Sequence, residues 1–277
     1  MLLVKKTLLN KVTIVTSPIE QSGKTTIANN LAYLFTKKGY VTCVIELNRY
    51  IGTSPYLNDN IDKDKDKSLK TAIEGNDETL ILRNFIQSSH NEALFTLSLR
   101  ISNDLSDLYK YNKEQLEKIV KIAVNKFDKV FIDVPMNYLD NGFIASINSS
   151  PEQTILIMDN NIVNWHKLKL YDLFFKQIKY SFPKVTCIIN KDEDMITDSF
   201  IKEIVSSFEM IKINNFYKMP FMKYIIKANN EGILFSDLIP SNKKERTLSK
   251  TFDSIIEDIE GSREVKKKFF SKKITKR

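Results

Sequence analysis

Strand-length apolar segments alternate with helical segments along this sequence, and this alternation constrains the fold more than any other feature. Residues 41–47 form a continuous apolar run, which is typical of a strand covered on both faces of a parallel sheet. Residues 11–16 are a β-branched strand, and residues 25–38 carry an apolar stripe at helical spacing. Further strands are predicted at 93–99, 129–134, 153–158, 185–189 and 215–219, and further helices at 113–126, 165–180, 198–208 and 248–259. The sequence therefore predicts an α/β fold, a single domain with a doubly wound, mostly parallel sheet flanked by helices.

One large domain accounts for the whole pattern. The chain has 277 residues, of which 42% are hydrophobic, and this is enough to build a full core. We assign residues 11–260 to the domain, residues 1–10 to an N-terminal extension and residues 261–277 to a basic C-terminal tail. Residues 58–70 alternate in charge without an apolar face, so we predict a solvated loop there.

The sequence predicts a cytoplasmic protein. No run reaches the roughly 18 apolar residues that a membrane span needs, and the first residues lack the pattern of a cleaved signal. Cys43 and Cys187 lie in separate apolar runs, which is typical of buried strand cysteines in a reducing compartment. His90 and His166 have no metal-ligating neighbours in sequence, so we expect exposed histidines rather than a metal site.

The positive charge is concentrated in the tail. The net charge is +8, and residues 263–277 contain eight basic residues against one acidic residue. An anionic partner would therefore engage the tail first. Phe269, Phe270 and Ile274 lie among the lysines, which suits an interfacial helix at the inner face of a membrane. A nonspecific contact with DNA and a plain solvated end are the alternatives.

A phosphate-binding motif lies where the first predicted strand turns into the first helix. Backbone N–H groups at a helix N-terminus attract phosphate, the lysine of a Gly-Lys-Thr triplet reaches the β- and γ-phosphates, and the threonine hydroxyl coordinates Mg²⁺. An ordinary Gly-Lys turn with a threonine cap is the alternative. The predicted nucleotide-binding residues here are Ser22, Gly23, Lys24, Thr25 and Thr26.

Four further segments follow this loop in the order typical of one protein family. They are NLA at 30–32, FDKVFIDVP at 127–135, CIINK at 187–191 and MPFMKYIIKANNEGILFSDL at 219–238. In their order and spacing, the sequence resembles the deviant Walker A ATPases of the ParA and MinD type, and most of all their pilus-localisation branch, CpaE and TadZ. The resemblance covers residues 11–260.

This resemblance implies ligands and residue roles. ATP with Mg²⁺ is the implied cofactor, and a homodimer is the implied assembly. Thr25, Asp133 and Glu46 match the family's metal-holding positions, and Asn190 matches the residue that reads the adenine edge. A strand-ending Asn190 that simply fits a turn is the alternative.

Four positions depart from the family pattern. Its signature lysine falls at Ile19 and its two loop glycines at Glu20 and Gln21, so no lysine at 19 can reach the transferring phosphate of a partner subunit. Asn48 replaces the aspartate that positions the attacking water, and an amide cannot take up a proton. With Lys24 and this degenerate Asn48 as the catalytic positions, we expect weak hydrolysis or none.

The resemblance leads to an expectation about function. We expect a dimerising, nucleotide-dependent switch that works with a protein partner of a positioning, partitioning, pilus, secretion or conjugation system. The alternative is a non-catalytic scaffold that kept the fold and lost productive nucleotide use. A related small-molecule P-loop enzyme is also open, although no substrate motif supports it.

Overall fold

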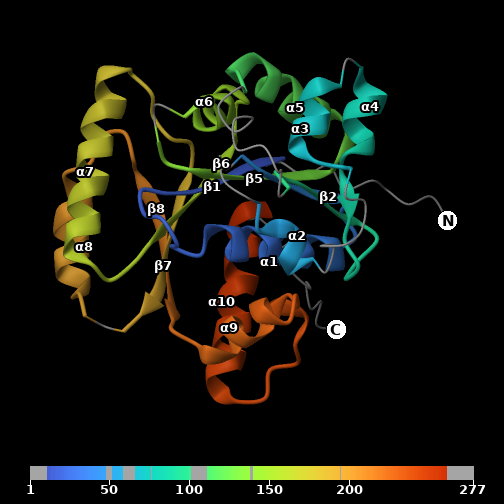
Figure 1. Cartoon of the computed structure of the whole chain (residues 1–277). Helices are drawn as coiled ribbons and strands as arrows, with labels where there is room; N and C mark the ends of the chain where they lie inside the picture. Colours follow the sequence, from blue (N-terminus) through green and yellow to red (C-terminus); the bar gives the residue numbers. More distant parts are fainter. Residues whose placement is uncertain are drawn as a thin grey trace, which may run out of the picture.

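The computed structural model describes residues 11–47, 52–58, 66–75, 77–100, 111–137, 140–193 and 195–260. These residues form one eight-stranded sheet in the order β3-β4-β2-β5-β1-β6-β7-β8 (Figure 1). Neighbouring strands run parallel except β3 and β4, which are antiparallel. The predicted α/β class is therefore confirmed. The strands are β1 (Val12–Ser17), β2 (Thr42–Glu46), β3 (Ile86–Gln87), β4 (Leu94–Leu97), β5 (Lys129–Pro135), β6 (Gln153–Met158), β7 (Val185–Asp192) and β8 (Ile213–Pro220).

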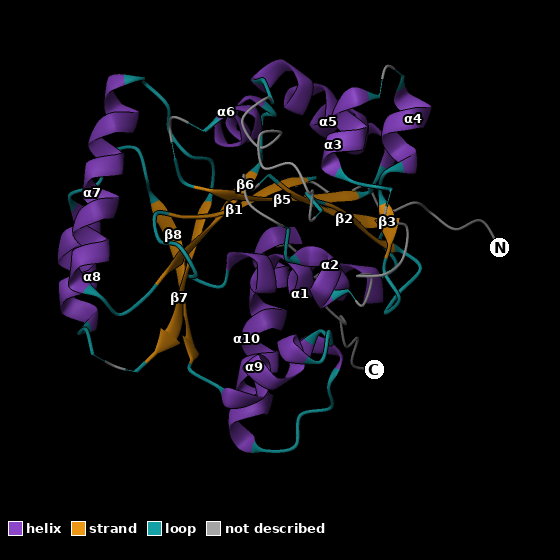
Figure 2. Cartoon of the chain, in the orientation of Figure 1, coloured by secondary structure: helices purple, strands orange, loops and turns teal. Residues whose placement is uncertain are grey.

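Helices cover both faces of the sheet (Figure 2). α1, α9 and α10 pack on one face, and α3 to α8 pack on the other. Their bounds are α1 (Lys24–Lys37), α2 (Ser54–Leu57), α3 (Leu69–Glu74), α4 (Glu78–Arg83), α5 (Lys113–Lys126), α6 (Asn141–Asn148), α7 (Ile162–Gln177), α8 (Asp198–Ser206), α9 (Lys223–Asn230) and α10 (Lys243–Glu260), with a 3-10 turn η2 (Phe235–Asp237).

The central strands are apolar throughout because both of their faces are buried. Successive side chains of a strand point to opposite faces. Ile14 of β1 and Ile132 of β5 lie in the core beneath α5, whereas Val15 and Phe131 lie in the core beneath α1. All four side chains are fully buried. This arrangement explains why these strands appear as continuous apolar runs in the sequence.

Most predicted elements lie where the sequence places them, although α7 begins earlier than predicted, at Ile162, and the start of α10 differs most. α5 and β6 have the predicted bounds. α10 begins at Lys243 rather than at residue 248, because Asn242 caps a polar first turn by accepting a 3.0 Å hydrogen bond from the Glu245 N–H. A first turn without apolar residues gives no periodic signal in the sequence.

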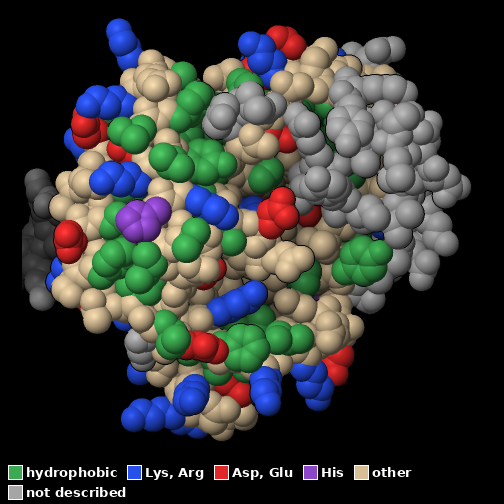
Figure 3. Space-filling model, turned by 60° about the vertical axis from the view of Figure 1, so that its left-hand side comes forward, with side chains coloured by type: hydrophobic (Ala, Val, Ile, Leu, Met, Phe, Trp, Pro, Cys, Tyr) green, Lys and Arg blue, Asp and Glu red, His purple; other side chains and the backbone are tan. Residues whose placement is uncertain are grey.

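Helix α7 is apolar on two sides. Trp165 and Phe175 are fully buried, whereas Ile178, directly after the helix, is 47% exposed. Val163 and Leu170 face solvent, with 59% and 67% of their surfaces exposed. Figure 3 is turned toward this side of the molecule, and hydrophobic side chains reach the surface among lysines there. The apolar spacing of this helix therefore does not distinguish its core face from its outer face.

Several predictions fall wholly or partly outside the described residues. The predicted loop at 58–70 is wrong at its C-terminal end, where Ser68 caps α3 by accepting a hydrogen bond from the Thr71 N–H, and residues 59–65 are not described. The extension at 1–10, the tail at 261–277 and Asn48 also lie outside the described residues. None of the helices in the described ranges is long and apolar enough to cross a membrane.

Candidate nucleotide site

The loop between β1 and α1 is shaped to receive an anion. β1 ends at Ser17 and α1 begins at Lys24, so residues 18–23 turn from the sheet into the helix. Gly23 has φ 91°, in the left-handed region that favours glycine. Among the described residues, no side chain caps α1, so its first backbone N–H groups remain available. Together with the helix dipole, these groups make the start of α1 suitable for binding an anion such as phosphate.

This loop lines a pocket of about 550 Å³, a size typical of small-molecule sites. The opposite wall is largely apolar and comes from the end of β8, from α9 and from η2. It consists of Met219, Pro220, Phe221, Met222, Ile225, Ile226, Asn229 and Phe235. A polar loop facing an apolar wall can hold a molecule that has phosphates at one end and a flat ring at the other.

Lys24 points back along its own loop. Its Nζ donates a 3.4 Å hydrogen bond to the backbone carbonyl oxygen of Ile19. Burial lowers the pKa of Lys24, while the carboxylates of Asp133, Glu20 and Glu46 act in the opposite direction. The ammonium group is therefore surrounded by negative charge in the chain without ligand.

Thr25 connects α1 to two buried carboxylates. Its hydroxyl donates a hydrogen bond to the Asp133 carboxylate at the end of β5, and Glu46 of β2 pairs with Asp133 in the sheet register. Burial, together with the neighbouring Glu46 charge, raises the pKa of Asp133 to about 7, although the hydrogen bond from Thr25 and the charge of Lys24 act in the opposite direction. A hydroxyl with two adjacent carboxylates is a set of oxygen ligands that suits Mg²⁺.

Glu46 has a second task in this structure. Its carboxylate accepts hydrogen bonds from the backbone N–H groups of Thr53, at 3.0 and 2.9 Å, and Ser54, at 2.9 Å. The Thr53 hydroxyl also donates to it, at 3.2 Å. Glu46 therefore holds the start of α2, which the strand pattern of the sequence did not reveal. A metal ion would share this carboxylate with the helix.

Asn190 lies at the pocket, although its side chain is turned toward the phosphate loop. Its Nδ2 donates a 2.7 Å hydrogen bond to the backbone carbonyl of Ser22. Its Oδ1 accepts a 3.0 Å hydrogen bond from the Lys191 N–H. Both polar atoms of this predicted base-reading residue therefore already have protein partners.

The predicted site residues divide into three groups. The loop residues Ser22, Gly23, Lys24, Thr25 and Thr26 line the pocket together with Asn190. Asp133 and Glu46 are buried beneath the loop, with 2% and 1% of their surfaces exposed. Asn48 lies outside the described residues.

Two buried oxygens of the pocket have no hydrogen-bond partner among the described residues. They are Ser22 Oγ in the phosphate loop and Asn229 Oδ1 on the opposite wall. Buried polar atoms without a partner are rare in folded proteins, and an ordered water or ion is a common explanation. The Ser22 hydroxyl can donate to an anion at the loop, whereas Asn229 Oδ1 can only accept a hydrogen bond from a donor group.

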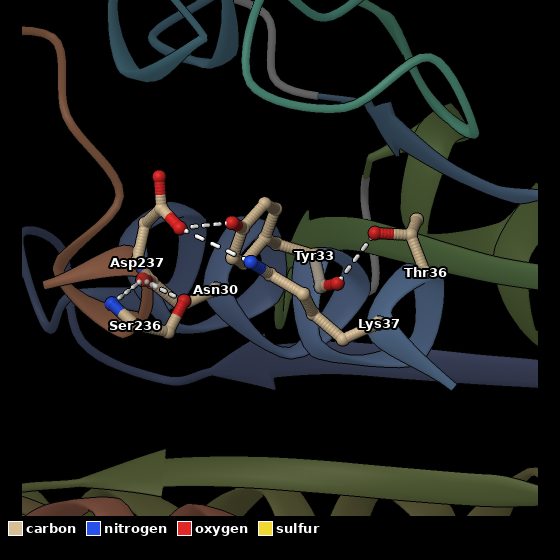
Figure 4. A network of polar contacts seen from close by, with 6 residues as sticks. All are labelled: Asn30, Tyr33, Thr36, Lys37, Ser236 and Asp237. Atoms are coloured by element: carbon tan, nitrogen blue, oxygen red, sulfur yellow. Dashed lines mark hydrogen bonds and ion pairs between the residues drawn. The ribbon is translucent and has the colours of Figure 1, made fainter. Parts of the chain in front are cut away.

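A polar network fixes the apolar wall against α1 (Figure 4). Tyr33 donates a hydrogen bond from its hydroxyl to the Asp237 carboxylate, and Lys37 Nζ lies 3.3 Å from the same group. Asn30 Oδ1 accepts hydrogen bonds from the Ser236 N–H at 2.9 Å and hydroxyl at 2.8 Å. The network holds η2 against the helix that begins at the phosphate loop.

His90 ties two further pocket segments together, although the sequence predicted an exposed side chain. It is only partly exposed, and its Nε2 lies 3.2 Å from the carbonyl oxygen of Leu57 in α2 and 2.9 Å from that of Gly232 after α9. Tyr56 and Leu57 line the pocket beside the phosphate loop. These contributions come from segments far apart in the chain, so no local motif could have identified them.

Comparisons with known proteins point to one fold. No family model matches the sequence, and no curated protein matches it. Among solved structures, the septum site-determining protein MinD of Pyrococcus horikoshii with Mg-ADP superposes with a TM-score of 0.69 at 16% identity, over 91% of this chain and 99% of that one. A ParA family ATPase of Chlorobium tepidum gives 0.73 at 14% identity, over 89% and 97%. An McdA variant of Cyanothece in complex with ATP gives 0.67 at 17% identity, over 92% and 98%.

At these identities, the likeness concerns the fold and extends over almost the whole of each neighbour. The chain therefore has the fold of the MinD and ParA ATPases.

Proposed function

We propose that this chain binds ATP with Mg²⁺ at the loop before α1 and acts as a dimerising, nucleotide-dependent switch with weak hydrolysis. One observation carries the proposal: the uncapped N-terminus of α1 and the side chain of Lys24 border a pocket of about 550 Å³. The pocket combines an anion-binding end with an apolar wall, as a nucleotide requires.

The residues present fit this ligand. The N–H groups at 22–26 would hold the phosphates, and Lys24 would exchange the Ile19 carbonyl for β- and γ-phosphate oxygens, which are stronger acceptors. Thr25 would hold Mg²⁺, with Asp133 and Glu46 behind it. The metal supplies positive charge that orients the phosphates and neutralises them.

We expect weak hydrolysis because the site lacks a cation and a base that cleavage would need. Ile19 offers no cation to a partner subunit, and Asn48 offers no base to an attacking water. Lys24 and Mg²⁺ would still favour binding. A switch of this kind would spend most of its time with ATP bound, and release would depend on nucleotide exchange more than on cleavage.

The solved neighbours suggest the kind of work that such a switch performs. They include a septum site-determining protein, a cell division ATPase and a MinC:MinD cell division complex. By analogy, two copies of this chain would pair around ATP in the cytoplasm and recruit a protein partner of a positioning, partitioning, pilus, secretion or conjugation system. We further propose that the basic residues 261–277 engage the inner face of the membrane, with DNA as the other anionic candidate.

A second candidate function is a scaffold that no longer uses nucleotide. The observation in its favour is Glu20, a carboxylate close enough to Lys24 to influence its pKa. Added negative charge beside the phosphate loop opposes phosphate binding. The same fold and outer surface could then serve a partner without any nucleotide cycle.

The deciding experiment measures binding of a fluorescent ATP analogue with Mg²⁺ to the wild type and to Lys24→Ala, with phosphate release followed in the same samples. Binding that is lost in the variant, with little phosphate release by the wild type, supports the switch. An exposed lysine on α7, Lys169, provides the matched control as Lys169→Ala. A wild type that binds no nucleotide rejects the switch and leaves the scaffold.

A further inference from the structure

The end of strand β7 holds the phosphate loop through two consecutive residues. Asn190 Nδ2 donates to the Ser22 carbonyl at 2.7 Å, and Lys191 Nζ donates to the Gln21 carbonyl at 3.3 Å. Asn190 Oδ1 in turn accepts from the Lys191 backbone N–H at 3.0 Å. Two adjacent carbonyls of the loop are therefore held by two adjacent residues of one strand.

The packing at this contact depends on glycine. A Cβ atom placed on Gly23 would lie 2.5 Å from Asn190 Nδ2, a distance that real Cβ atoms do not tolerate. Gly23 therefore leaves the space that the Asn190 amide fills. The close approach shows that loop and strand end are packed as one unit.

Both residues of the lysine contact have an unusual backbone. Gln21 has φ 55° and Lys191 has φ 56°, in the left-handed region that non-glycine residues rarely adopt. The β7–β8 register shifts between Asn190 and Asp192, as in a β-bulge. Bulges beside functional sites re-aim a side chain, and this one aims Lys191 at the loop. Backbone strain of this kind persists only where surrounding contacts enforce it.

The bulge is itself anchored. The Asp192 carboxylate accepts a hydrogen bond from Asn160 and lies 3.8 Å from Lys218 Nζ on β8. Lys218 also pairs with Asp198 at the start of α8, at 2.9 Å. The strand end that holds the phosphate loop is thus fixed to two other elements.

We propose that Asn190 and Lys191 form a latch that holds the phosphate loop in its binding shape in the absence of nucleotide. The latch compensates for Gln21, which adopts a conformation suited to glycine without being glycine. In this role Asn190 and Lys191 are positioning residues that act through Gln21 and Ser22. The inference rests on the proposed function only in assuming that the held loop is the nucleotide site.

The latch is distinguishable from two other roles for the same side chains. A residue that reads the base discriminates between adenine and guanine nucleotides. A residue that contacts the outermost phosphate discriminates between ATP and ADP. A latch sets the loop shape that every nucleotide meets. Its loss therefore weakens the binding of ATP, ADP and GTP by the same factor.

The test uses the full chain with Asn190→Leu, Lys191→Met and the exposed control Lys169→Met. Dissociation constants are measured for fluorescent ATP, ADP and GTP analogues with Mg²⁺. Asn190→Leu removes the amide donor without adding charge and is expected to weaken binding of all three by about tenfold, and Lys191→Met by about threefold, with the control unchanged. A loss confined to adenine nucleotides, or one that is larger for ATP than for ADP, overturns the latch. Dissociation constants that are unchanged in both variants also overturn the latch.

A rescue experiment addresses the strained residue directly. Gln21→Gly removes the backbone strain, so the Lys191→Met loss is expected to shrink in the Gln21→Gly background. If Lys191→Met has the same effect in both backgrounds, the compensation between these residues is rejected. Because Lys191 is exposed, Lys191→Met should have the same thermal midpoint as the control Lys169→Met.

A second readout needs no nucleotide. Amide hydrogen exchange of the peptide that contains residues 18–24 is measured on ligand-free protein. Faster exchange in Asn190→Leu and Lys191→Met than in the control supports the latch, and unchanged exchange rejects it. This readout remains informative if the wild type binds no nucleotide, so failure of the proposed function and failure of the latch are separable.

Discussion

The Thr25 hydroxyl donates a hydrogen bond to the Asp133 carboxylate, and this contact joins the first turn of α1 to the end of β5. Asp133→Asn keeps the shape and removes the charge that would support Mg²⁺. We expect the Mg²⁺-dependent part of ATP affinity to fall by about 10- to 100-fold, the usual effect of losing a group that supports a metal ligand. The measurement compares dissociation constants with Mg²⁺ and with EDTA, and Asp253→Asn on the surface of α10 is the control. A loss of equal size in EDTA would contradict the metal role.

The same substitution is expected to stabilise the chain without ligand. Burial raises the pKa of Asp133 to about 7, so its ionised form is unfavourable in the folded state at pH 8. The unfolded chain carries no such penalty. Asp133→Asn should therefore raise the thermal midpoint at pH 8 in nucleotide-free protein, and the gain should shrink toward pH 5. A lower midpoint at pH 8 would show that the carboxylate stabilises the fold.

Glu46 should contribute more to the stability of the fold than to the charge of the nucleotide site. Glu46→Ala leaves the N–H groups of Thr53 and Ser54 without their acceptor. We expect the free energy of unfolding to fall by about 1–3 kcal/mol, the effect of leaving buried donors unsatisfied. Urea unfolding measures it, with the exposed Glu74→Ala on α3 as the matched control. Equal midpoints for the two variants would refute this role.

The tyrosine of the network in Figure 4 should contribute more than the lysine beside it. Tyr33 is almost fully buried and donates to Asp237, whereas the Lys37 side chain is 53% exposed. Tyr33→Phe should lower the free energy of unfolding by about 1 kcal/mol. Lys37→Met should have a smaller effect, because exposed ion pairs contribute little. The reverse order in urea unfolding would refute the assignment.

Lys129 predicts a pH dependence of stability. This lysine is fully buried, and its Nζ donates to Thr13 Oγ1 at 2.6 Å and lies 5.4 Å from the centre of the Phe35 ring. Burial lowers the pKa of Lys129 from 10.5 to about 7, partly opposed by Glu152 and Glu260. Between these pH values, the unfolded chain binds a proton at this side chain that the folded chain does not bind. The free energy of unfolding should therefore rise with pH from about 7 to 10 and be flat below about 7 with respect to this group.

Lys129→Met removes this titration and should flatten the slope. Urea unfolding at pH 7, 8 and 9 gives the slope for the wild type, for Lys129→Met and for Lys126→Met. Lys126 is an exposed lysine at the end of α5 and serves as the control. If the free energy of unfolding changes with pH equally in the wild type and in Lys129→Met, Lys129 is charged in the folded chain over this pH range.

The sequence was sufficient to predict features that depend on the residues of a single strand, helix or loop. The bounds of α5 and β6 were predicted correctly because each element carries its own pattern: an apolar stripe on one face of α5, and an apolar run in β6, which is covered on both faces. The loop between β1 and α1 lies where the sequence placed it, since its motif is contiguous in the chain. These features need no knowledge of distant residues.

Features that depend on two distant segments were not visible in the sequence. The strand pattern of residues 42–46 does not reveal that Glu46 also caps α2, and nothing near Asn190 reveals that its amide turns to Ser22. The pocket wall at Tyr56 and Phe235 is likewise set by tertiary packing. The exposure of Val163 and Leu170 on α7 is likewise not visible in the sequence, because periodicity does not say which side of an apolar helix is covered.

The close contact between Gly23 and Asn190 also bears on how such a chain diverges. A Cβ atom at position 23 would collide with the Asn190 amide, so replacing this glycine also requires a change at 190. Two positions far apart in the chain must therefore change together, and this packing constraint on the Gly-Lys-Thr core is independent of any nucleotide that the loop binds.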